Sequence, residues 1–269
     1  MKTIKQLPAL AVAACFAVLP LRAQDWAKAR LEKSPRHGEW VKVKHGDREV
    51  NCFITYPEVK DKAAAVVVIH EIFGLTDWVR GVTDQLAEAG YIAIAPDLLF
   101  GAGPGGGGTA ELGGSDAVRK AISSLPPEQV TADLKAAADY AAKLPASNGK
   151  VAVAGFCWGG AQAFRFAAND PDLKAAFVFY GTPPTSAEEF ARINCPVHGF
   201  YAGNDARVTQ TVPQAAEQMK AAAKTYQPVT YEGAGHGFMR AGEAPDASGA
   251  NKKARDEAWK RWKELLQKI

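Results

Sequence analysis

A cysteine framed by glycines is the feature of this sequence whose residue types and spacing most directly suggest chemistry. In VAVAGFCWGG, Cys157 lies between Gly155 and Gly159, where an apolar run meets a segment with helical character. A nucleophile on a tight strand-to-helix turn has this glycine frame, usually with serine in place of cysteine. At a helix N-terminus the backbone N–H dipoles favour thiolate, and the N–H of Trp158 can receive a developing oxyanion. The alternative is a buried structural thiol, which is what most free cysteines are.

An acid and a base follow this cysteine along the chain. Asp205 ends the strand-like PVHGFYAGND, and His236 follows the strand-like PVTYEGAG. Open α/β sheets build their sites at such strand C-termini. The order nucleophile, acid, base is that of the α/β-hydrolases. The carboxylate would hold the imidazole in the tautomer that accepts the thiol proton. The three residues therefore predict a Cys157–His236–Asp205 triad.

Alternating strand and helix patterns must position these residues. AAAVVVIH, YIAIAPD, VAVAGF, AAFVFYG and PVHGFYAGND are typical of strands covered on both faces. WVKVKHG and EVNCFITYP alternate like half-exposed strands, and QPVTYEGAG is a weaker final strand. Helical patterns are expected at about 77–89, 130–144, 159–168, 212–225 and 253–268. With right-handed crossovers, this alternation predicts an α/β-hydrolase fold: a mostly parallel, doubly wound sheet flanked by helices.

Residues 1–23 have the pattern of a secretory signal peptide. Two lysines precede an uncharged run, 7–21, and Ala23 offers a small residue at the exit. A membrane span is the weaker alternative, because the run is short and two prolines interrupt it. Lipoprotein processing at Cys15 is a second alternative, but the apolar run continues beyond it. We expect cleavage near Ala23, a periplasmic or secreted protein, and one mature domain over 24–269.

Charge and cysteine usage narrow the possible partners. The formal net charge of +3 falls to 0 after cleavage, because the leader holds three basic residues and no acidic one. A neutral surface gives no long-range attraction to nucleic acid or anionic membrane. Cys52, Cys157 and Cys195 are an odd number, so at least one thiol stays free. We interpret Cys52 and Cys195 as packed thiols, with a disulfide between them as the alternative. The lack of zinc-ligand spacing predicts no metal, and no cofactor is expected.

Two segments interrupt the strand–helix alternation. GAGPGGGGTAELGGSD, which starts at Gly101, is predicted to be a non-helical, mobile loop over the site rather than an interdomain linker. DWAKARLEKSPRHG is predicted to be a short helical arm on the surface. Among the histidines, His198 is predicted in the core and His37 and His45 on the surface. His70 ends a strand and could lie near the site.

Five motifs resemble the dienelactone hydrolase family, and the resemblance covers nearly all of the mature chain. They are HEIFGL (70–75), IAPDL (94–98), GFCWGG (155–160), AGND (202–205) and GAGHGFMR (233–240). Cysteine in the elbow is characteristic of this family. The resemblance implies that Cys157 is the nucleophile, Asp205 the acid and His236 the base.

The resemblance also implies roles for residues around the triad. Glu71 is similar to a family carboxylate that contacts the resting thiol and helps to activate it when substrate arrives. The N–H of Ile72 would complete an oxyanion hole with that of Trp158. Arg240 matches a family arginine near Glu71 and the substrate carboxylate. A solvated acid or ion-pair partner is the alternative for Glu71, and an exposed salt bridge is the alternative for Arg240.

Three departures separate this chain from the dienelactone enzymes. Those enzymes carry a second arginine shortly after PDL, where Gly101 stands here. Loss of one guanidinium would weaken selection of small anionic lactones. Trp158 is a bulkier neighbour of the nucleophile, and the leader is a further difference. The fold and triad carry over, but dienelactone as substrate does not.

The expected function is hydrolysis of lactones or small carboxylic esters by the Cys-His-Asp triad through an acyl-thioester. The expected partner is therefore a small-molecule ester or lactone, with no nucleic acid and no membrane span after leader removal. The oligomeric state is left open. The alternative is a non-catalytic thiol-sensing or ligand-binding protein on the same scaffold.

Overall fold

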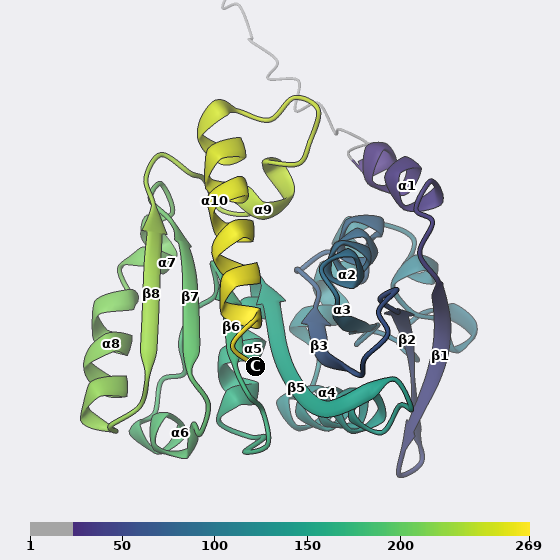
Figure 1. Cartoon of the computed structure of the whole chain (residues 1–269), viewed down its shortest axis with the longest axis horizontal. Coiled ribbons are helices and arrows are strands. Elements are labelled where there is room, and N and C mark those ends of the chain that lie inside the picture. The colour runs from purple at the N-terminus through teal and green to yellow at the C-terminus, as the bar shows by residue number, and fades with distance from the viewer. Residues whose placement is uncertain (1–23) are drawn as a thin grey trace, which may run out of the picture.

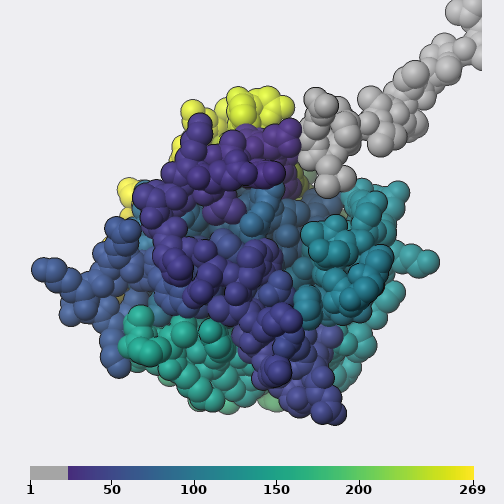
Figure 2. Space-filling view, turned by 90° about the vertical axis from the view of Figure 1, so that its right-hand side faces the viewer, coloured from purple at the N-terminus to yellow at the C-terminus, as the bar shows by residue number. Residues whose placement is uncertain are grey.

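The computed structural model describes residues 24–269. The predicted leader lies outside the described residues, so cleavage near Ala23 stays a prediction. Within 24–269, no helix combines the length and apolar character needed to cross a membrane. Figure 2 shows that the N-terminal part of the described chain, drawn in purple, spreads over one face of the molecule.

An eight-stranded sheet forms the centre of the molecule, in the order β1-β2-β4-β3-β5-β6-β7-β8 (Figure 1). The strands are β1 (Gly38–His45), β2 (Arg48–Thr55), β3 (Ala63–Ile69), β4 (Ile92–Pro96), β5 (Ser147–Phe156), β6 (Ala176–Phe179), β7 (Val197–Ala202) and β8 (Tyr226–Tyr231). β2 pairs antiparallel with β1 and β4, and all other neighbours are parallel. Each predicted strand forms, and the predicted fold class is confirmed.

Helices cover both faces of this sheet. They are α1 (Asp25–Glu32), α2 (Asp77–Glu88), α3 (Ser115–Ser123), α4 (Pro127–Ala142), α5 (Trp158–Ala167), α6 (Ala187–Arg192), α7 (Ala206–Thr209), α8 (Val212–Ala221), α9 (Phe238–Ala241) and α10 (Gly249–Leu266). In Figure 1, α10 crosses the near face of the sheet and α5 lies behind it. The five predicted helices correspond to α2, α4, α5, α8 and α10, and the predicted helical arm is α1.

The alternation of side chains along β3 shows why its sequence is continuously apolar. Val66 and Val68 pack in the cluster that includes α2 and α10, whereas Val67 and Ile69 pack in the cluster that includes α4 and α5. All four side chains are fully buried. Each such burial contributes about 1.5–3 kcal/mol relative to exposure. A parallel strand between two helix layers therefore has no polar face, which is the pattern that identified it.

The parallel strands bring distant segments to one edge. β3 is in register with β5 (Ile69 opposite Gly155), and β7 is in register with β8 (Ala202 opposite Tyr231). Because these strands run in the same direction, the segments that follow them leave the sheet at the same edge. Those segments carry the predicted site residues.

The glycine-rich segment differs from the prediction that it contains no helix. It holds two 3₁₀ turns, Pro104–Gly106 and Thr109–Leu112, and the start of α3. The backbone N–H and the hydroxyl of Thr109 each donate to Asp97, both at 2.7 Å. A Cβ on Gly108 would lie 2.2 Å from an oxygen of that carboxylate. The glycine-rich composition predicted an irregular loop. In the structure, the lack of a side chain on Gly108 allows a helical turn to pack against the buried Asp97 carboxylate.

The alternative of a Cys52–Cys195 disulfide is wrong. Both residues are buried free thiols. Cys52 lies on β2 and Cys195 just before β7, and these strands are far apart in the sheet order. The interpretation of both as packed thiols is confirmed.

The histidines outside the predicted triad have different surroundings. His37 is exposed and His198 is buried, as predicted. His45, predicted on the surface, has a side chain that is 26% exposed, and its Nε2 lies 2.6 Å from Asp133, a buried carboxylate that also accepts hydrogen bonds from Arg48. Because α4 packs against the β1–β2 hairpin, an acid far away in sequence becomes the partner of His45.

Candidate active site

The turn between β5 and α5 holds Cys157 in strained backbone geometry. Its φ is 56° and its ψ −116°, in a region that costs a non-glycine residue about 1–3 kcal/mol. Hydrogen bonds on both sides hold it: its N–H donates to the carbonyl of Phe179 and its carbonyl accepts from the N–H of Gly160, each at 3.0 Å. The sulfur therefore lies at the N-terminus of α5 in a conformation imposed by its surroundings.

The glycines of the elbow are required by contacts between backbone segments. A Cβ on Gly155 would lie 1.9 Å from the carbonyl oxygen of Gly159. A Cβ on Gly159 would lie 2.4 Å from the carbonyl oxygen of His70. No side chain fits at either position, because the first turn of α5 packs directly on the ends of β3 and β5. This is the physical content of the Gly-x-Cys-x-Gly pattern.

His236 and Asp205 lie together after β8 and β7. The imidazole Nδ1 is 2.5 Å from Asp205 Oδ2, and the Asp205 residue is only 7% exposed. The backbone around the histidine is held from α10, since Asn251 accepts from the N–H of Gly235 at 2.9 Å. Gly237, on the other side, has a left-handed φ of 76° and starts α9. His236 is thus presented from a turn rather than from a strand or helix.

The surroundings of His236 favour its charged form. Its interaction with the Cys157 sulfur is the largest cause, and the hydrogen bond with Asp205 adds to it; together they overcome burial and raise the pKa of His236 to about 9. The imidazole is therefore protonated at neutral pH and lies beside the sulfur. The structure brings together all three residues that the chain order had suggested.

Glu71 and Arg240 form a second charged pair at the same edge. Glu71 is 2% exposed, and its Oε2 accepts from Arg240 Nε at 2.7 Å. The guanidinium also lies over the ring of Phe73, 5.3 Å from its centroid. Burial raises the pKa of Glu71, and the charge of Arg240 opposes that shift. The partner of Arg240 is thus a buried acid, rather than an exposed one as in the alternative considered above.

The expected contact between Glu71 and the resting thiol is not among the hydrogen bonds of residues 24–269. The carboxylate instead faces Arg240, which comes from α9. Its sequence position, at the end of β3, does not specify which of the groups at the sheet edge it meets. The role of Glu71 toward the thiol stays a prediction.

The two residues predicted to donate to an oxyanion, Ile72 and Trp158, pack their side chains on the same apolar cluster. Ile72 lies in the turn after β3, and Trp158 is the first residue of α5. In the described part of the chain, neither backbone N–H has a hydrogen-bond acceptor. Both side chains pack on a small apolar cluster beside α3, formed by Leu99, Val118 and Ile122. Leu112, at the end of the glycine-rich segment, packs on that cluster too.

Tyr180 is not among the predicted site residues, although its position marks it. It follows β6 with a φ of 41°, is 1% exposed, and forms a T-shaped ring contact with His236, with the ring centroids 5.1 Å apart. Its hydroxyl has no hydrogen-bond partner among the described residues. Burial raises the pKa of Tyr180 well above its usual value. Its place at the C-terminal end of a parallel strand was the available signal; its left-handed backbone was not readable from sequence.

His70 also belongs to the surroundings of the site. It is fully buried, its Nδ1 lies 2.8 Å from the carbonyl oxygen of Glu71, and its ring stacks on Trp158 with centroids 5.5 Å apart. Burial lowers the pKa of His70, so the ring is neutral. It therefore connects the turn of Glu71 with the first residue of α5.

The sheet topology, the strained elbow and the acid and histidine after β7 and β8 define an α/β-hydrolase. A family model described as "Dienelactone hydrolase family" matches residues 50–269. The chain is 32% identical over 201 residues to a "Putative carboxymethylenebutenolidase" of Salmonella typhi, covering 71% of this chain and 73% of the relative. The chain belongs to the dienelactone hydrolase family and is a hydrolase of carboxylic ester bonds.

Solved structures agree with this assignment. A putative dienelactone hydrolase from Klebsiella pneumoniae superimposes with a TM-score of 0.76 at 27% identity, covering 87% of this chain and 99% of that one. An acylaminoacyl peptidase from Pyrococcus horikoshii superimposes with a TM-score of 0.68 at 13% identity, over 90% of this chain and 43% of the peptidase. The second likeness shows the fold alone.

Proposed function

We propose that this protein hydrolyses lactones or small carboxylic esters, with Cys157 as nucleophile, His236 as acid and base, and Asp205 as the partner that orients the imidazole. The single observation that carries the proposal is geometric: the strained elbow places Cys157 at the sheet edge where His236 lies, with its Nδ1 2.5 Å from the buried Asp205 carboxylate. A cysteine held only for packing needs neither that backbone geometry nor a protonated histidine beside it.

Acylation would begin with attack of the Cys157 thiolate on the ester carbonyl carbon. The N–H groups of Ile72 and Trp158, which lack acceptors within residues 24–269, would hold the oxyanion. As the tetrahedral intermediate collapses, the C–O bond breaks and the imidazolium of His236 gives its proton to the departing oxygen. The products are an acyl-thioester and an alcohol, which remains tethered when the substrate is a lactone.

Deacylation would use the change in charge that acylation produces. The largest cause of the raised pKa of His236 is its bond with the thiol, and an acylated sulfur no longer supplies that bond. The imidazole, neutral after donating its proton, can then take one from water as hydroxide attacks the thioester. The Cys157 sulfur leaves as the C–S bond breaks, the carboxylic acid is released, and the free enzyme is restored.

The substrate class follows from the cations that the site offers. Arg240 is already paired with Glu71, and residue 101 is glycine where a second arginine would stand in the dienelactone enzymes. At these positions the chain therefore lacks the two free arginines that would bind a substrate carboxylate. We assign the site to esters and lactones whose binding does not depend on such a carboxylate site.

Export of the protein is part of the proposal and rests on the pattern of residues 1–23. The expected mature N-terminus is near Gln24. N-terminal sequencing of the protein recovered from the periplasm or medium tests this. An intact N-terminus in the cytoplasmic fraction alone would rule it out.

The catalytic proposal is tested with p-nitrophenyl esters and a panel of lactones. We expect Cys157→Ala and His236→Ala each to abolish hydrolysis while the circular dichroism spectrum is unchanged, and Cys157→Ser to keep little activity. Mass spectrometry of the quenched wild-type reaction should find an acyl adduct on Cys157. Full turnover by the alanine variants would refute the triad. Reversible oxidation of Cys157, without hydrolysis of any ester, would instead support the thiol-sensing alternative.

A further inference from the structure

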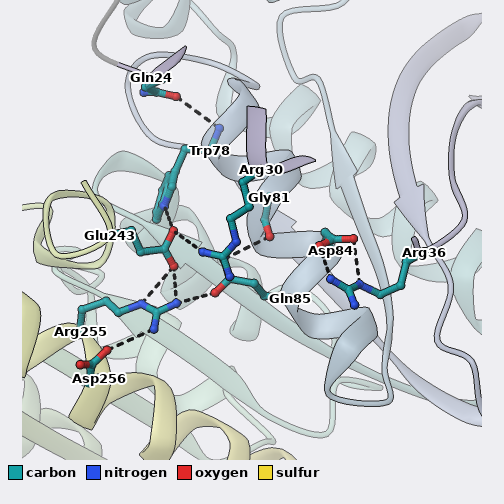
Figure 3. A network of polar contacts seen from close by, with 10 residues as sticks. All are labelled: Gln24, Arg30, Arg36, Trp78, Gly81, Asp84, Gln85, Glu243, Arg255 and Asp256. Atoms are coloured by element: carbon teal, nitrogen blue, oxygen red, sulfur yellow. Dashed lines mark hydrogen bonds and ion pairs between the residues drawn. The ribbon is translucent and has the colours of Figure 1, made fainter. Parts of the chain in front are cut away.

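Glu243 is a buried carboxylate that none of the proposed catalytic steps uses. Its side chain is only 6% exposed. Oε2 accepts from Trp78 Nε1 at 3.1 Å, and Oε1 accepts from Arg255 through both Nε, at 3.0 Å, and Nη2. Arg30 Nη1 lies farther away, 3.8 Å from Oε2. These donors come from α2, α10 and α1, and Figure 3 shows them converging on the one carboxylate. We call Glu243, Trp78 and Arg255 the Glu243 clamp.

Arg255 of the Glu243 clamp also takes part in hydrogen bonds that connect α10 with α2. Arg255 Nη2 also donates to Gln85 Oε1 at 2.5 Å, and Gln85 Nε2 donates to the carbonyl of Gly81 at 3.2 Å. The chain before Glu243 is pressed onto α10, because a Cβ on Gly242 would lie 2.6 Å from Arg255 Cβ. Two long helices therefore hold Glu243 in place, as Figure 3 shows.

The segment just before Glu243 carries a residue of the site. α9 is a helix of four residues, and its third residue is Arg240, the partner of Glu71. Glu243 N–H donates to the carbonyl of Arg240 at 3.2 Å. One helical turn has almost no stability of its own, so the contacts at its ends decide where it lies. Buried Phe238 anchors its start, and the Glu243 clamp anchors its end.

We propose that Glu243 is a positioning residue: the clamp sets the end of α9 so that the Arg240 guanidinium stays on the Glu71 carboxylate at the edge of the site. This inference rests on the proposed function, which assigns Glu71 and Arg240 to the site. A carboxylate suits the position because it accepts from an indole and a guanidinium together and compensates a largely buried cation. An amide of equal size would turn one N–H₂ group toward those donors.

A second buried ion pair on α2 serves as a matched control. Asp84, whose side chain is 5% exposed, accepts from Arg36 through Nε and Nη2 at 2.9 and 2.7 Å. Figure 3 shows this pair beside the clamp, joined to it by no drawn contact. Asp84→Asn and Glu243→Gln therefore each remove one negative charge from an ion pair with arginine, and the two ion pairs are buried to a similar extent beside α2. Only Glu243 adjoins α9.

The test is a double-mutant cycle on p-nitrophenyl butyrate hydrolysis. We expect Glu243→Gln to lower kcat/KM roughly tenfold, mostly through kcat, since a small displacement of a positioning group is enough for such a loss. Asp84→Asn should change kcat/KM less than about twofold. In an Arg240→Ala background, Glu243→Gln should cost less than about a further twofold, because the residue through which it acts is gone. Arg30→Ala, at a half-exposed and longer contact, should have an effect below about twofold.

The outcomes separate positioning from general stability. Fully multiplicative losses of kcat/KM in the double variant would overturn the proposal, and so would an equal loss in Asp84→Asn. Hydrogen exchange of the amides from Arg240 to Gly242 gives a second readout that needs no turnover. Faster exchange there in Glu243→Gln, but not in Asp84→Asn, supports the clamp, and unchanged exchange refutes it. If the wild type hydrolyses no ester, the proposed function fails while this measurement still decides the clamp.

Discussion

The elbow after β5 and the turn after β8 both carry residues of the proposed site, yet different forces hold them. At the elbow the constraint is steric, between backbone segments: a side chain on Gly155 would meet the Gly159 carbonyl, one on Gly159 would meet that of His70, and Cys157 has a positive φ. The turn after β8 is held by polar contacts from afar, through Asn251 to Gly235 and through the Glu243 clamp.

This difference predicts different responses to mutation. Two backbone segments in direct contact cannot move apart to admit a side chain. A substitution that adds one there should therefore prevent folding. A polar anchor has several partners and partial substitutes, so breaking it should leave a folded protein with a displaced group. Four changes, taken from the largest expected effect to the smallest, test that distinction.

Gly155→Ala should have the largest effect. The new Cβ would lie 1.9 Å from the Gly159 carbonyl oxygen. We expect a loss of more than about 4 kcal/mol of unfolding free energy, or no soluble protein, together with loss of esterase activity. Gly81→Ala is the control, because a Cβ there meets nothing within 4 Å; as a helical glycine it should gain about 0.5–1 kcal/mol. A stable, active Gly155→Ala would contradict the steric account.

Arg240→Ala comes next. It leaves the Glu71 carboxylate, which is 2% exposed, without its cation. We expect a loss of about 3 kcal/mol in urea unfolding at pH 7. We also expect kcat/KM to fall roughly 10- to 100-fold, because the group that orients Glu71 is missing. Arg36→Ala breaks a pair with another buried acid, Asp84, and should lower stability with unchanged kinetics. Wild-type kinetics in Arg240→Ala would remove Arg240 from the site.

The third change alters the pKa of His236 and leaves the fold in place. In the wild type, NMR titration of the imidazole should give a pKa of about 9 for His236. In Cys157→Ala it should fall well below that value, since the bond with the thiol is the largest cause of the shift; Asp205→Asn should lower it too. Because the pKa of His236 is raised in the folded state, its protonation stabilises the fold fully at pH values below the usual histidine pKa. This contribution is lost as pH rises through about 9.

Stability measured against pH checks the same assignment. Because the imidazolium is favoured only in the folded state, the wild type should lose unfolding free energy between neutral pH and pH 9, beyond any loss seen in Cys157→Ala. Identical titration of His236 in the wild type and in Cys157→Ala would show that the sulfur does not interact with the imidazole.

Asn251→Ala should have the smallest effect. It removes the acceptor of the Gly235 N–H, a hydrogen bond of 2.9 Å beside His236. We expect about 1 kcal/mol in unfolding free energy and a modest fall in kcat. Asn204→Ala is the matched control: its amide donates to Gly233, in the same turn, but at an exposed site, so its loss should cost below about 0.5 kcal/mol. Equal effects of the two would mean that burial of the anchor is unimportant.

Much of the fold was predictable from sequence because its signals are periodic and local. Continuous apolar runs marked the parallel strands, since each of them is buried on both faces. The missed parts depend on contacts across the chain. The helical turns of the glycine-rich segment form against Asp97, and His45 finds Asp133, which is 88 residues away. Neither partner can be read from composition.

The same division holds within the site. The placement of Cys157, Asp205 and His236 at one edge of the sheet was predictable because each follows a strand and their order is characteristic. Their catalytic roles stay a prediction. Tyr180 follows a strand too, but its interest lies in a left-handed backbone and a buried hydroxyl without a hydrogen-bond partner in residues 24–269, which only the folded structure displays.

By itself, the sequence determined where the strands lie, at which positions a turn excludes a side chain, and that the elbow carries a cysteine. These follow from hydrophobic periodicity, which acts over short stretches, and from the glycine pattern that a tight strand-to-helix turn requires. Only the tertiary structure decided which charges meet: Glu71 with Arg240, and Glu243 with Trp78 and Arg255. A charged side chain can pair with many partners, and folding selects among them by burying some groups together and keeping others apart.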